Sequence, residues 1–231
     1  MYYNLYRLIY IFMLMSIIRK ATLKDVEQIY NLYKIVAKHN PGNLTQEEDE
    51  ITTYYVEKMV KNGLERGLIL VTEREGQIIG YFKAFTSEFR NMAHILSDLT
   101  LMIHPNYQKI GYGSMLFKKS LEEITKNMRH IYQTEFTTGM QNILFYKKFG
   151  FEIAIEYEDI ENNKVAVLMT QKNINFSQEK LNEYQRYLAN LRQNKINTYK
   201  IHSKENQINQ NINFLPSSYN YNFTNIVDNI S

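Results

Sequence analysis

The sequence predicts an α/β domain with a mixed, mostly antiparallel sheet and helices on both faces, in the order βααβββαβαββ. Three observations indicate this fold class. Residues 68–72 and 77–85 have the pattern of a hairpin around a Glu-Gly turn. Residues 95–103 form a mostly apolar run that leads through a glycine-containing loop into an amphipathic helix. Residues 152–157 and 164–170 have the pattern of a second hairpin.

The elements before the first hairpin are read from capping and turn signals. Residues 16–19 are the predicted first strand. Thr22 opens a Thr-x-x-Asp sequence that resembles a capping box, and the helix after it ends at a Pro-Gly pair at residues 41–42. A second helix is predicted from residue 46 to about residue 62. Its first turn holds four carboxylates at residues 47–50, which we interpret as a solvated helix start that the helix dipole favours.

Between the two hairpins, the amphipathic helix ends near Asn127 and residues 131–137 alternate as a strand. A short helix then ends at Gly150, where glycine favours a left-handed cap.

The chain divides into four segments. Residues 1–15 are an apolar leader, shorter than the roughly 20 residues of a membrane helix and without a cleavage site for a signal peptidase. Either this leader is untranslated or disordered, or it contacts a membrane or a partner. Residues 16–172 are the predicted domain, and residues 173–193 an amphipathic helix that packs on the domain or forms a dimer contact. The asparagine-rich tail, residues 194–231, is predicted to be disordered.

Composition argues against several function classes. A net charge of +3 over 231 residues is too small to indicate a nucleic-acid or anionic-membrane partner. The absence of cysteine excludes disulfides, thiolate nucleophiles and zinc–cysteine sites. It also excludes an acyl group carried on a cysteine.

A glycine-containing loop, Gln108-x-x-Gly111-x-Gly113, joins the apolar strand to its helix. Free backbone N–H groups and the helix dipole make such a junction an anion site, and glycine lets the backbone approach a ligand closely. No Gly-Lys pair follows, so the loop is not a P-loop. Leu116 stands where a dinucleotide fingerprint needs its third glycine, which disfavours NAD. We therefore predict a pyrophosphate site.

The loop resembles the acetyl-CoA motif of the GCN5-related N-acetyltransferases (GNAT), which reads Gln/Arg-x-x-Gly-x-Gly/Ala. A second stretch, at residues 139–151, resembles the family's helix ending in Tyr-x-x-x-Gly-Phe, here residues 146–151. The family often has Asn where this chain has Gly139, and Asn142 falls one helical turn later. The resemblance covers about residues 16–172. It implies the GNAT fold, acetyl-CoA as acetyl donor, and no metal.

The resemblance also implies where coenzyme A binds. The strand before the loop would pair its exposed backbone with the pantetheine arm, and the loop would hold the pyrophosphate. The candidate binding residues are Leu101, Met102, Ile103, Gln108, Lys109, Ile110, Gly111, Tyr112, Gly113, Ser114 and Asn142.

Tyr146 is the candidate general acid toward the departing sulfur, a role that the resemblance implies. Deprotonating the amine needs a base, a water chain or a desolvated pocket, because an alkylammonium has a pKa of about 10.4. The family's usual position for a base falls on Ser97, whereas Asp98 would point to the opposite face of a regular strand. The candidates for the base are Asp98, Glu135, His94 and His104, and the sequence does not choose among them.

The sequence therefore predicts a cytoplasmic enzyme that moves an acetyl group from acetyl-CoA directly to a primary amine of a small molecule or a peptide. The carboxylates at residues 47–50 have the alternative role of drawing cationic amines toward the acceptor cleft. Two other functions stay open: a CoA-binding regulatory module that has lost turnover, and a membrane-tethered interaction protein built around residues 1–15. A homodimer is the alternative to a monomer.

Overall fold

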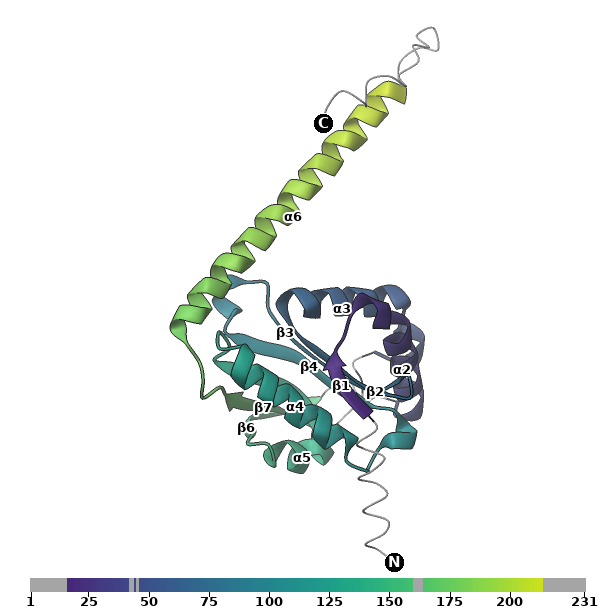
Figure 1. Cartoon of the computed structure of the whole chain (residues 1–231), viewed down its shortest axis with the longest axis vertical. Coiled ribbons are helices and arrows are strands. Elements are labelled where there is room, and N and C mark those ends of the chain that lie inside the picture. Colours follow the sequence, from purple (N-terminus) through teal and green to yellow (C-terminus); the bar gives the residue numbers. More distant parts are fainter. Residues whose placement is uncertain (1–15, 42–43, 45, 160–163, 214–231) are drawn as a thin grey trace, which may run out of the picture. The chain divides into compact units, whose positions relative to one another are not determined.

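A computed structural model describes residues 16–41, 44, 46–159 and 164–213 (Figure 1). The predicted leader and the last part of the predicted tail lie outside these residues. The helices and strands follow the predicted order and end with one further helix. They are β1 (Ser16–Lys20), α2 (Val26–His39), α3 (Thr53–Arg66), β2 (Gly67–Arg74), β3 (Gln77–Thr86), β4 (Ile95–Ile103), α4 (Tyr112–Asn127), β5 (Gln133–Gly139), α5 (Ile143–Lys147), β6 (Glu152–Asp159), β7 (Lys164–Lys172) and α6 (Gln178–Asn213).

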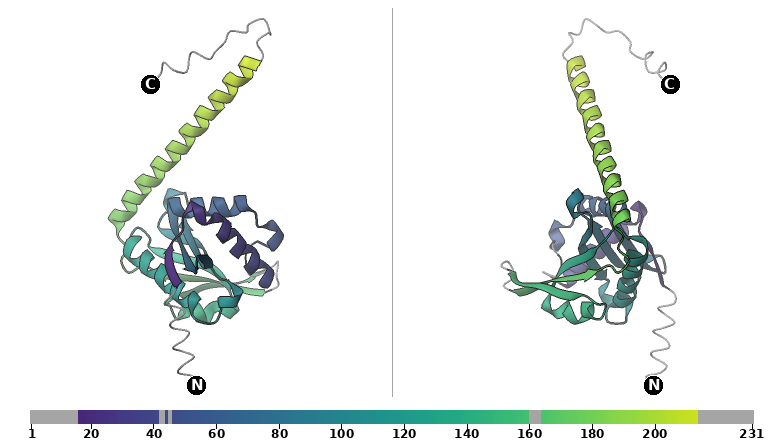
Figure 2. Two further views of the ribbon diagram at one scale, coloured as in Figure 1. Left: turned by 45° about the vertical axis from the view of Figure 1, so that its right-hand side comes forward. Right: turned by 90° about the vertical axis from the view of Figure 1, so that its left-hand side faces the viewer.

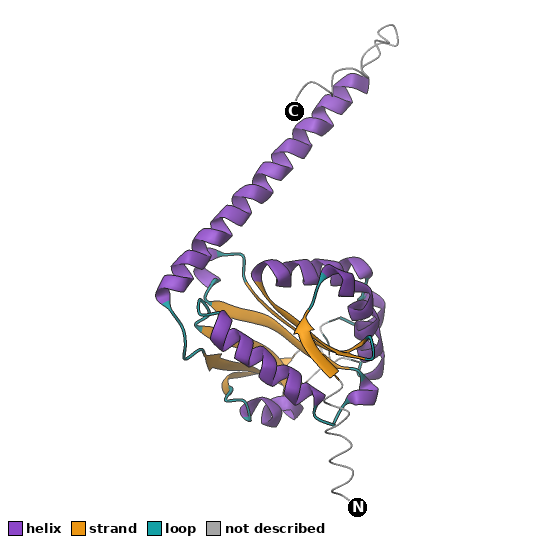
Figure 3. Cartoon of the chain, viewed as in Figure 1, coloured by secondary structure: helices purple, strands orange, loops and turns teal. Residues whose placement is uncertain are grey.

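The seven strands form one sheet in the order β1-β2-β3-β4-β5-β7-β6. Every neighbouring pair is antiparallel except β4 and β5, which are parallel and are connected through α4. The predicted mixed, mostly antiparallel sheet is therefore confirmed. Helices cover both faces, as the coloured ribbons of Figure 3 and the turned views of Figure 2 show.

Each face of the sheet is buried in its own hydrophobic core. Side chains alternate across a strand, so neighbouring residues of β3 enter different cores. Tyr81 packs with α2 and α3, whereas Phe82 packs with α4 and lies 6.2 Å, centroid to centroid, from Phe117. The side chains of Tyr81 and Phe82 are both fully buried. This two-sided burial explains why the strand is an almost continuous apolar run rather than an alternating one.

Two predicted boundaries differ from the structure. The carboxylates at residues 47–50 precede α3 in a short 3-10 turn, and the helix begins only at Thr53. The reason is the Thr52 side chain, which accepts a hydrogen bond from the backbone N–H of Tyr55 and caps the helix there. At the other end of the chain, α6 continues past residue 193, so residues 194–213 are helical where the sequence indicated disorder.

The structure contains two compact units, whose described residues are 16–185 and 186–213. The first two turns of α6 belong to the first unit. The Tyr184 hydroxyl lies 2.7 Å from Thr86 Oγ1, and its ring stacks on His130 with centroids 3.9 Å apart. Burial lowers the pKa of His130 to about 4. In the described part of the chain, no helix is both long and apolar enough to cross a membrane.

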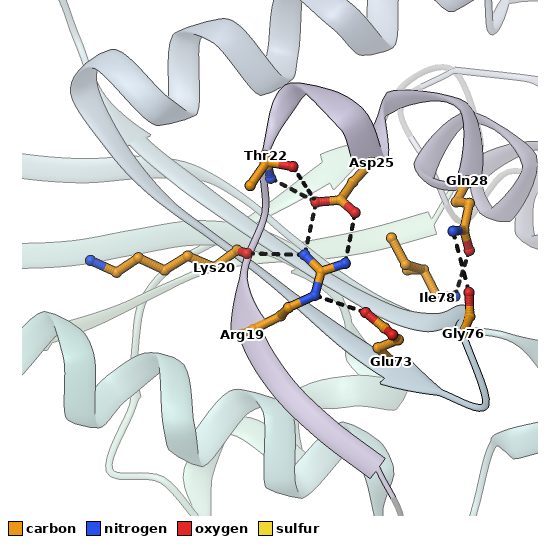
Figure 4. Close-up of polar contacts among 8 residues, drawn as sticks. All are labelled: Arg19, Lys20, Thr22, Asp25, Gln28, Glu73, Gly76 and Ile78. Atoms are coloured by element: carbon orange, nitrogen blue, oxygen red, sulfur yellow. Dashed lines mark hydrogen bonds and ion pairs between the residues drawn. The ribbon is translucent and has the colours of Figure 1, made fainter.

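An ion-pair network joins β1 to the start of α2 and to β2 (Figure 4). The Arg19 guanidinium donates two hydrogen bonds to Asp25, at 2.7 and 2.8 Å, and one to Glu73 at 2.8 Å. Asp25 also accepts from the backbone N–H of Thr22, which completes the predicted capping box. The hydrogen bonds from Arg19 lower the pKa of Asp25 to about 2, against an opposing effect of burial.

We expect Asp25→Asn to lower the free energy of unfolding at pH 7 by about 2 kcal/mol. The folded pKa of Asp25 is depressed, so its stabilisation is fully present above the unfolded value near 4 and is lost as the pH falls toward 2. Urea unfolding at pH 7 and at pH 3 measures this loss. The free energies of unfolding of the variant and the wild type should differ less at pH 3 than at pH 7. Asp49→Asn, at an exposed carboxylate, is the control. Equal stability of wild type and Asp25→Asn at pH 7 would contradict the expectation.

Candidate active site

The strand–loop–helix junction after β4 has the backbone geometry of an anion site. A 3-10 turn (Pro105–Tyr107) follows the strand, and α4 begins at Tyr112. Gly111 is the N-cap of α4, with φ 106° and ψ −12°, in the left-handed region that glycine adopts without steric cost. The first turn of the helix leaves backbone N–H groups without intrahelical partners. The junction therefore offers donors and a positive dipole end to an anion.

One side chain of the loop, that of Gln108, has a role inside the protein, whereas Gly113 has none. Gln108 donates from Nε2 to the backbone carbonyl of Ile103 at 2.9 Å, which ties the loop to the end of β4. Gly113 lies inside the first turn of α4, where a Cβ would make an ordinary 3.6 Å contact with Ile103. Packing within the described chain therefore does not require glycine at position 113, whereas a ligand close to the backbone would.

β4 and β5 pair at only two positions and then separate. The pairs are Ile95 with Gln133 and Leu96 with Thr134. Beyond them β4 stays paired with β3, and β5 stays paired with β7 along its whole length. Each strand follows its antiparallel partner, so residues 97–103 have no strand partner on the β5 side. We call this separation the splay.

A β-bulge in β4 lies at the head of the splay. Lys83 pairs with Thr100 and Phe85 pairs with Ser97, so residues 98 and 99 lie opposite a single β3 residue. Asp98 has φ 50°, and its Oδ1 is 2.9 Å from Lys83 Nζ, on the face that α2 and α3 cover. The expectation that Asp98 points to the opposite face from Ser97 is therefore wrong, because it assumed a regular strand.

Glu135, on β5, projects to the same face of the sheet as Asp98. It follows Thr134, the last β5 residue that pairs with β4. Its neighbours Thr134 and Phe136 are buried, and Phe136 packs in the α4 core, so Glu135 projects to the other face. Its Oε2 accepts a hydrogen bond from Gln133 Nε2 at 2.8 Å. The two candidate carboxylates thus lie on one face of the sheet, on the two sides of the splay.

The two candidate histidines have structural contacts instead. His104 Nδ1 accepts a hydrogen bond from the backbone N–H of Asn106 and caps the 3-10 turn, and burial lowers its pKa. The His94 carbonyl accepts from the backbone N–H groups of Tyr132 and Gln133, which joins the starts of β4 and β5.

Tyr146 lies on α5 in a cluster of aromatic rings. Its ring centroid is 4.4 Å from that of Phe136 and 5.3 Å from that of Phe117. Burial raises the pKa of Tyr146 to about 12. The aromatic packing holds the ring, while its hydroxyl makes no hydrogen bond to a described residue. Gly150 has φ 83°, which confirms the predicted left-handed turn after this helix.

The second motif brings one further candidate to the same end of the sheet. Asn142 immediately precedes α5, and its Nδ2 donates to Thr138 Oγ1 at 3.2 Å. Among the described residues, no group of three or more His, Asp or Glu side chains is arranged to hold a metal ion.

Residues 65–153 match the family model for the acetyltransferase (GNAT) domain. This stretch contains β4 with its bulge, the glycine loop, α4 and Tyr146. The chain has the GNAT fold. Its seven-stranded, mostly antiparallel sheet with helices matches the folds of GNAT structures.

Solved structures with low sequence identity share the fold of this chain. An acetyltransferase of the GNAT family from Streptococcus pneumoniae has a TM-score of 0.61 and 21% identity, over 68% of this chain and 98% of that one. yncA, a putative acetyltransferase from Salmonella typhimurium solved with acetyl-CoA, has a TM-score of 0.59 and 17% identity, over 68% and 93%. A ribosomal-protein-alanine N-acetyltransferase from Brucella melitensis has a TM-score of 0.59 and 20% identity, over 68% and 99%.

Sequence reasoning missed the residues that surround Asp98. Lys83 is 3% exposed and forms an ion pair with it. Tyr33, Tyr55 and Tyr81 come from α2, α3 and β3. Burial raises the pKa of all three, to about 12 for Tyr55, and the charge of Asp98 adds to the effect. The sequence did contain one indication of this cluster, a lysine in the apolar run of β3, because lysine is rarely buried without a charged partner.

Proposed function

We propose that this GNAT domain is an N-acetyltransferase that moves an acetyl group from acetyl-CoA directly to a primary amine of a small molecule or a peptide. One observation carries the proposal: the splay leaves residues 97–103 without a β5 partner immediately before a helix N-terminus. Strand backbone pairs with extended amide-bearing ligands, and helix N-termini bind phosphate. Acetyl-CoA has both an amide-bearing arm and a diphosphate, and yncA was solved with it.

The candidate binding residues divide by role. Leu101, Met102 and Ile103 offer backbone to the pantetheine arm while their side chains pack in the cores. The loop from Gln108 to Ser114 holds the diphosphate, chiefly through backbone N–H groups. Asn142, immediately before α5, is the proposed contact to the arm from the β5 side.

The transfer makes one bond and breaks one, the acceptor nitrogen loses two protons, and the sulfur gains one. The neutral amine nitrogen attacks the thioester carbonyl carbon and gives up a proton as the amide forms, the carbon–sulfur bond breaks, and Tyr146 gives its proton to the departing sulfur and regains one from solvent. The ammonium form of the acceptor first loses a proton, which costs roughly 4.6 kcal/mol at neutral pH for a pKa of about 10.4. Because the chain has no cysteine, no acyl-thiol intermediate on the protein is available.

Asp98 and Glu135 are the proposed bases, since both lie on the face opposite α4 at the head of the splay. Asp98→Asn and Glu135→Gln separate them, because each variant keeps the side-chain shape and removes the proton acceptor. The variant that lacks the base should lose about 10²-fold in kcat.

The test has two stages. Acetyl-CoA at 100 times its Kd should stabilise the protein by about 2.7 kcal/mol, visible as a rise in Tm, and NAD should not. Release of free thiol from acetyl-CoA is then measured with a panel of monoamines, polyamines and peptides. Stabilisation without thiol release would favour a CoA-binding regulatory module, and no stabilisation would overturn the proposal. Residues 1–15, on which a membrane-tethered function would rest, lie outside the described residues.

A further inference from the structure

Lys83 carries a buried ammonium group in the middle of β3. Its side chain is 3% exposed, and its strand neighbours Phe82 and Ala84 are fully buried. Lysine is almost never fully buried unless it is paired, because removing an ammonium from water without a partner is costly. A lysine at this position therefore depends on an anion at the end of its side chain.

Asp98 is that anion. Lys83 needs Asp98 as a partner, whereas Asp98 does not need Lys83. Oδ1 of Asp98 lies 2.9 Å from Lys83 Nζ, which also lies 5.0 Å from the centroid of the Phe85 ring. The Asp98 side chain is 52% exposed, so water could solvate its carboxylate without help from Lys83. Its second oxygen, Oδ2, accepts no hydrogen bond from a described residue. The ion pair thus leaves one carboxylate oxygen available.

The bulge places Asp98 at the head of the splay. Asp98 adopts φ 50°, a left-handed conformation that Asp tolerates better than most residues other than glycine. It lies two residues beyond Leu96, the last β4 residue that pairs with β5. Bulges re-aim side chains next to active sites, and a backbone held in this region persists only when its surroundings hold it there. The contact with Lys83 is such a constraint.

We propose that Lys83 is a positioning residue for acetyl transfer: its buried ammonium holds Asp98 so that Oδ2 receives the incoming amine. The inference rests on the proposed function and adds a residue outside the CoA loop to it. Lys83 acts only through Asp98. Replacing Lys83 should therefore lower kcat/KM for the amine and leave the affinity for acetyl-CoA unchanged.

The test is a double-mutant cycle of Lys83→Met and Asp98→Asn in the full chain, with amine and acetyl-CoA kinetics, acetyl-CoA affinity and Tm measured for each protein. Methionine replaces the buried stem by an apolar chain of similar length, and the exposed Asp98 carboxylate remains solvated. We expect each single variant to lose about 10²-fold in kcat/KM for the amine, as small misplacements in active sites do. The double variant should lose no more than Asp98→Asn alone. Acetyl-CoA affinity should stay within about 2-fold.

Two comparisons distinguish positioning from a purely structural role. Lys83→Arg keeps a charged donor and should recover most of the activity lost in Lys83→Met. Lys61→Met, at an exposed lysine paired with Glu57, is the matched control and should be silent. If Lys83→Met fails to fold, Lys83→Gln takes its place in the cycle.

Wild-type kcat/KM in the Lys83 variants, or losses that multiply in the double variant, would overturn the inference. A wild-type protein that binds acetyl-CoA but acetylates no amine would instead overturn the proposed function, and the positioning role with it.

Discussion

Replacing Tyr146 by phenylalanine is expected to lower kcat about 10²-fold, the lower end of the range for a general acid. Burial raises the pKa of this phenol to about 12, so the hydroxyl is protonated throughout the working pH range and has a proton to give. A thiolate can also leave without protonation, which is why the expected loss is not larger. Steady-state thiol release at saturating acetyl-CoA and amine measures the change.

The phenylalanine variant should fold and bind normally. Its ring keeps the contacts with Phe136 and Phe117, and the hydroxyl that is removed bonds no described residue. Tm and the KM for acetyl-CoA should therefore change little. Tyr132→Phe removes a hydroxyl at the opposite end of β5 and serves as the matched control. A Tyr146→Phe enzyme with the wild-type kcat would remove this residue from the mechanism.

Replacing Gly111 by alanine is expected to weaken acetyl-CoA binding about 10- to 100-fold, the equivalent of losing one hydrogen bond to a charged group. At φ 106° a Cβ is strained, so the loop must shift and its N–H groups must leave their positions at the start of α4. Isothermal titration with acetyl-CoA measures the affinity, and thermal unfolding measures the cost in stability.

Gly76→Ala is the control that separates the effect of backbone strain from the loss of acetyl-CoA affinity. Gly76 has φ 77° in the β2–β3 turn, and a Cβ there would have no neighbour within 4 Å. Both variants should lose about 1–2 kcal/mol of stability from the left-handed backbone, and only Gly111→Ala should lose affinity. Equal affinities for acetyl-CoA in both variants would show that the diphosphate binds elsewhere and would remove the basis of the proposed function.

Much of the fold was predictable because its signals are local. The two glycines of the loop, the Thr22 capping box and the cap at Gly150 each depend on a few neighbouring residues, so their patterns are visible in the chain. The start of α3 was misplaced because a run of carboxylates and a capping threonine give competing helix starts within a few residues.

By itself the sequence determined the order of the elements, the strand–loop–helix junction at which we predict an anion site, and the place of Tyr146 in the second motif. The tertiary structure alone decided that β4 leaves β5 after Leu96, that Asp98 turns to the face of α2 and α3, and that Lys83 holds it there. The physical reason is that each of these features depends on pairing between segments far apart in the chain. Which strand neighbours which, and in what register, sets where a bulge must form and which buried charge needs a partner.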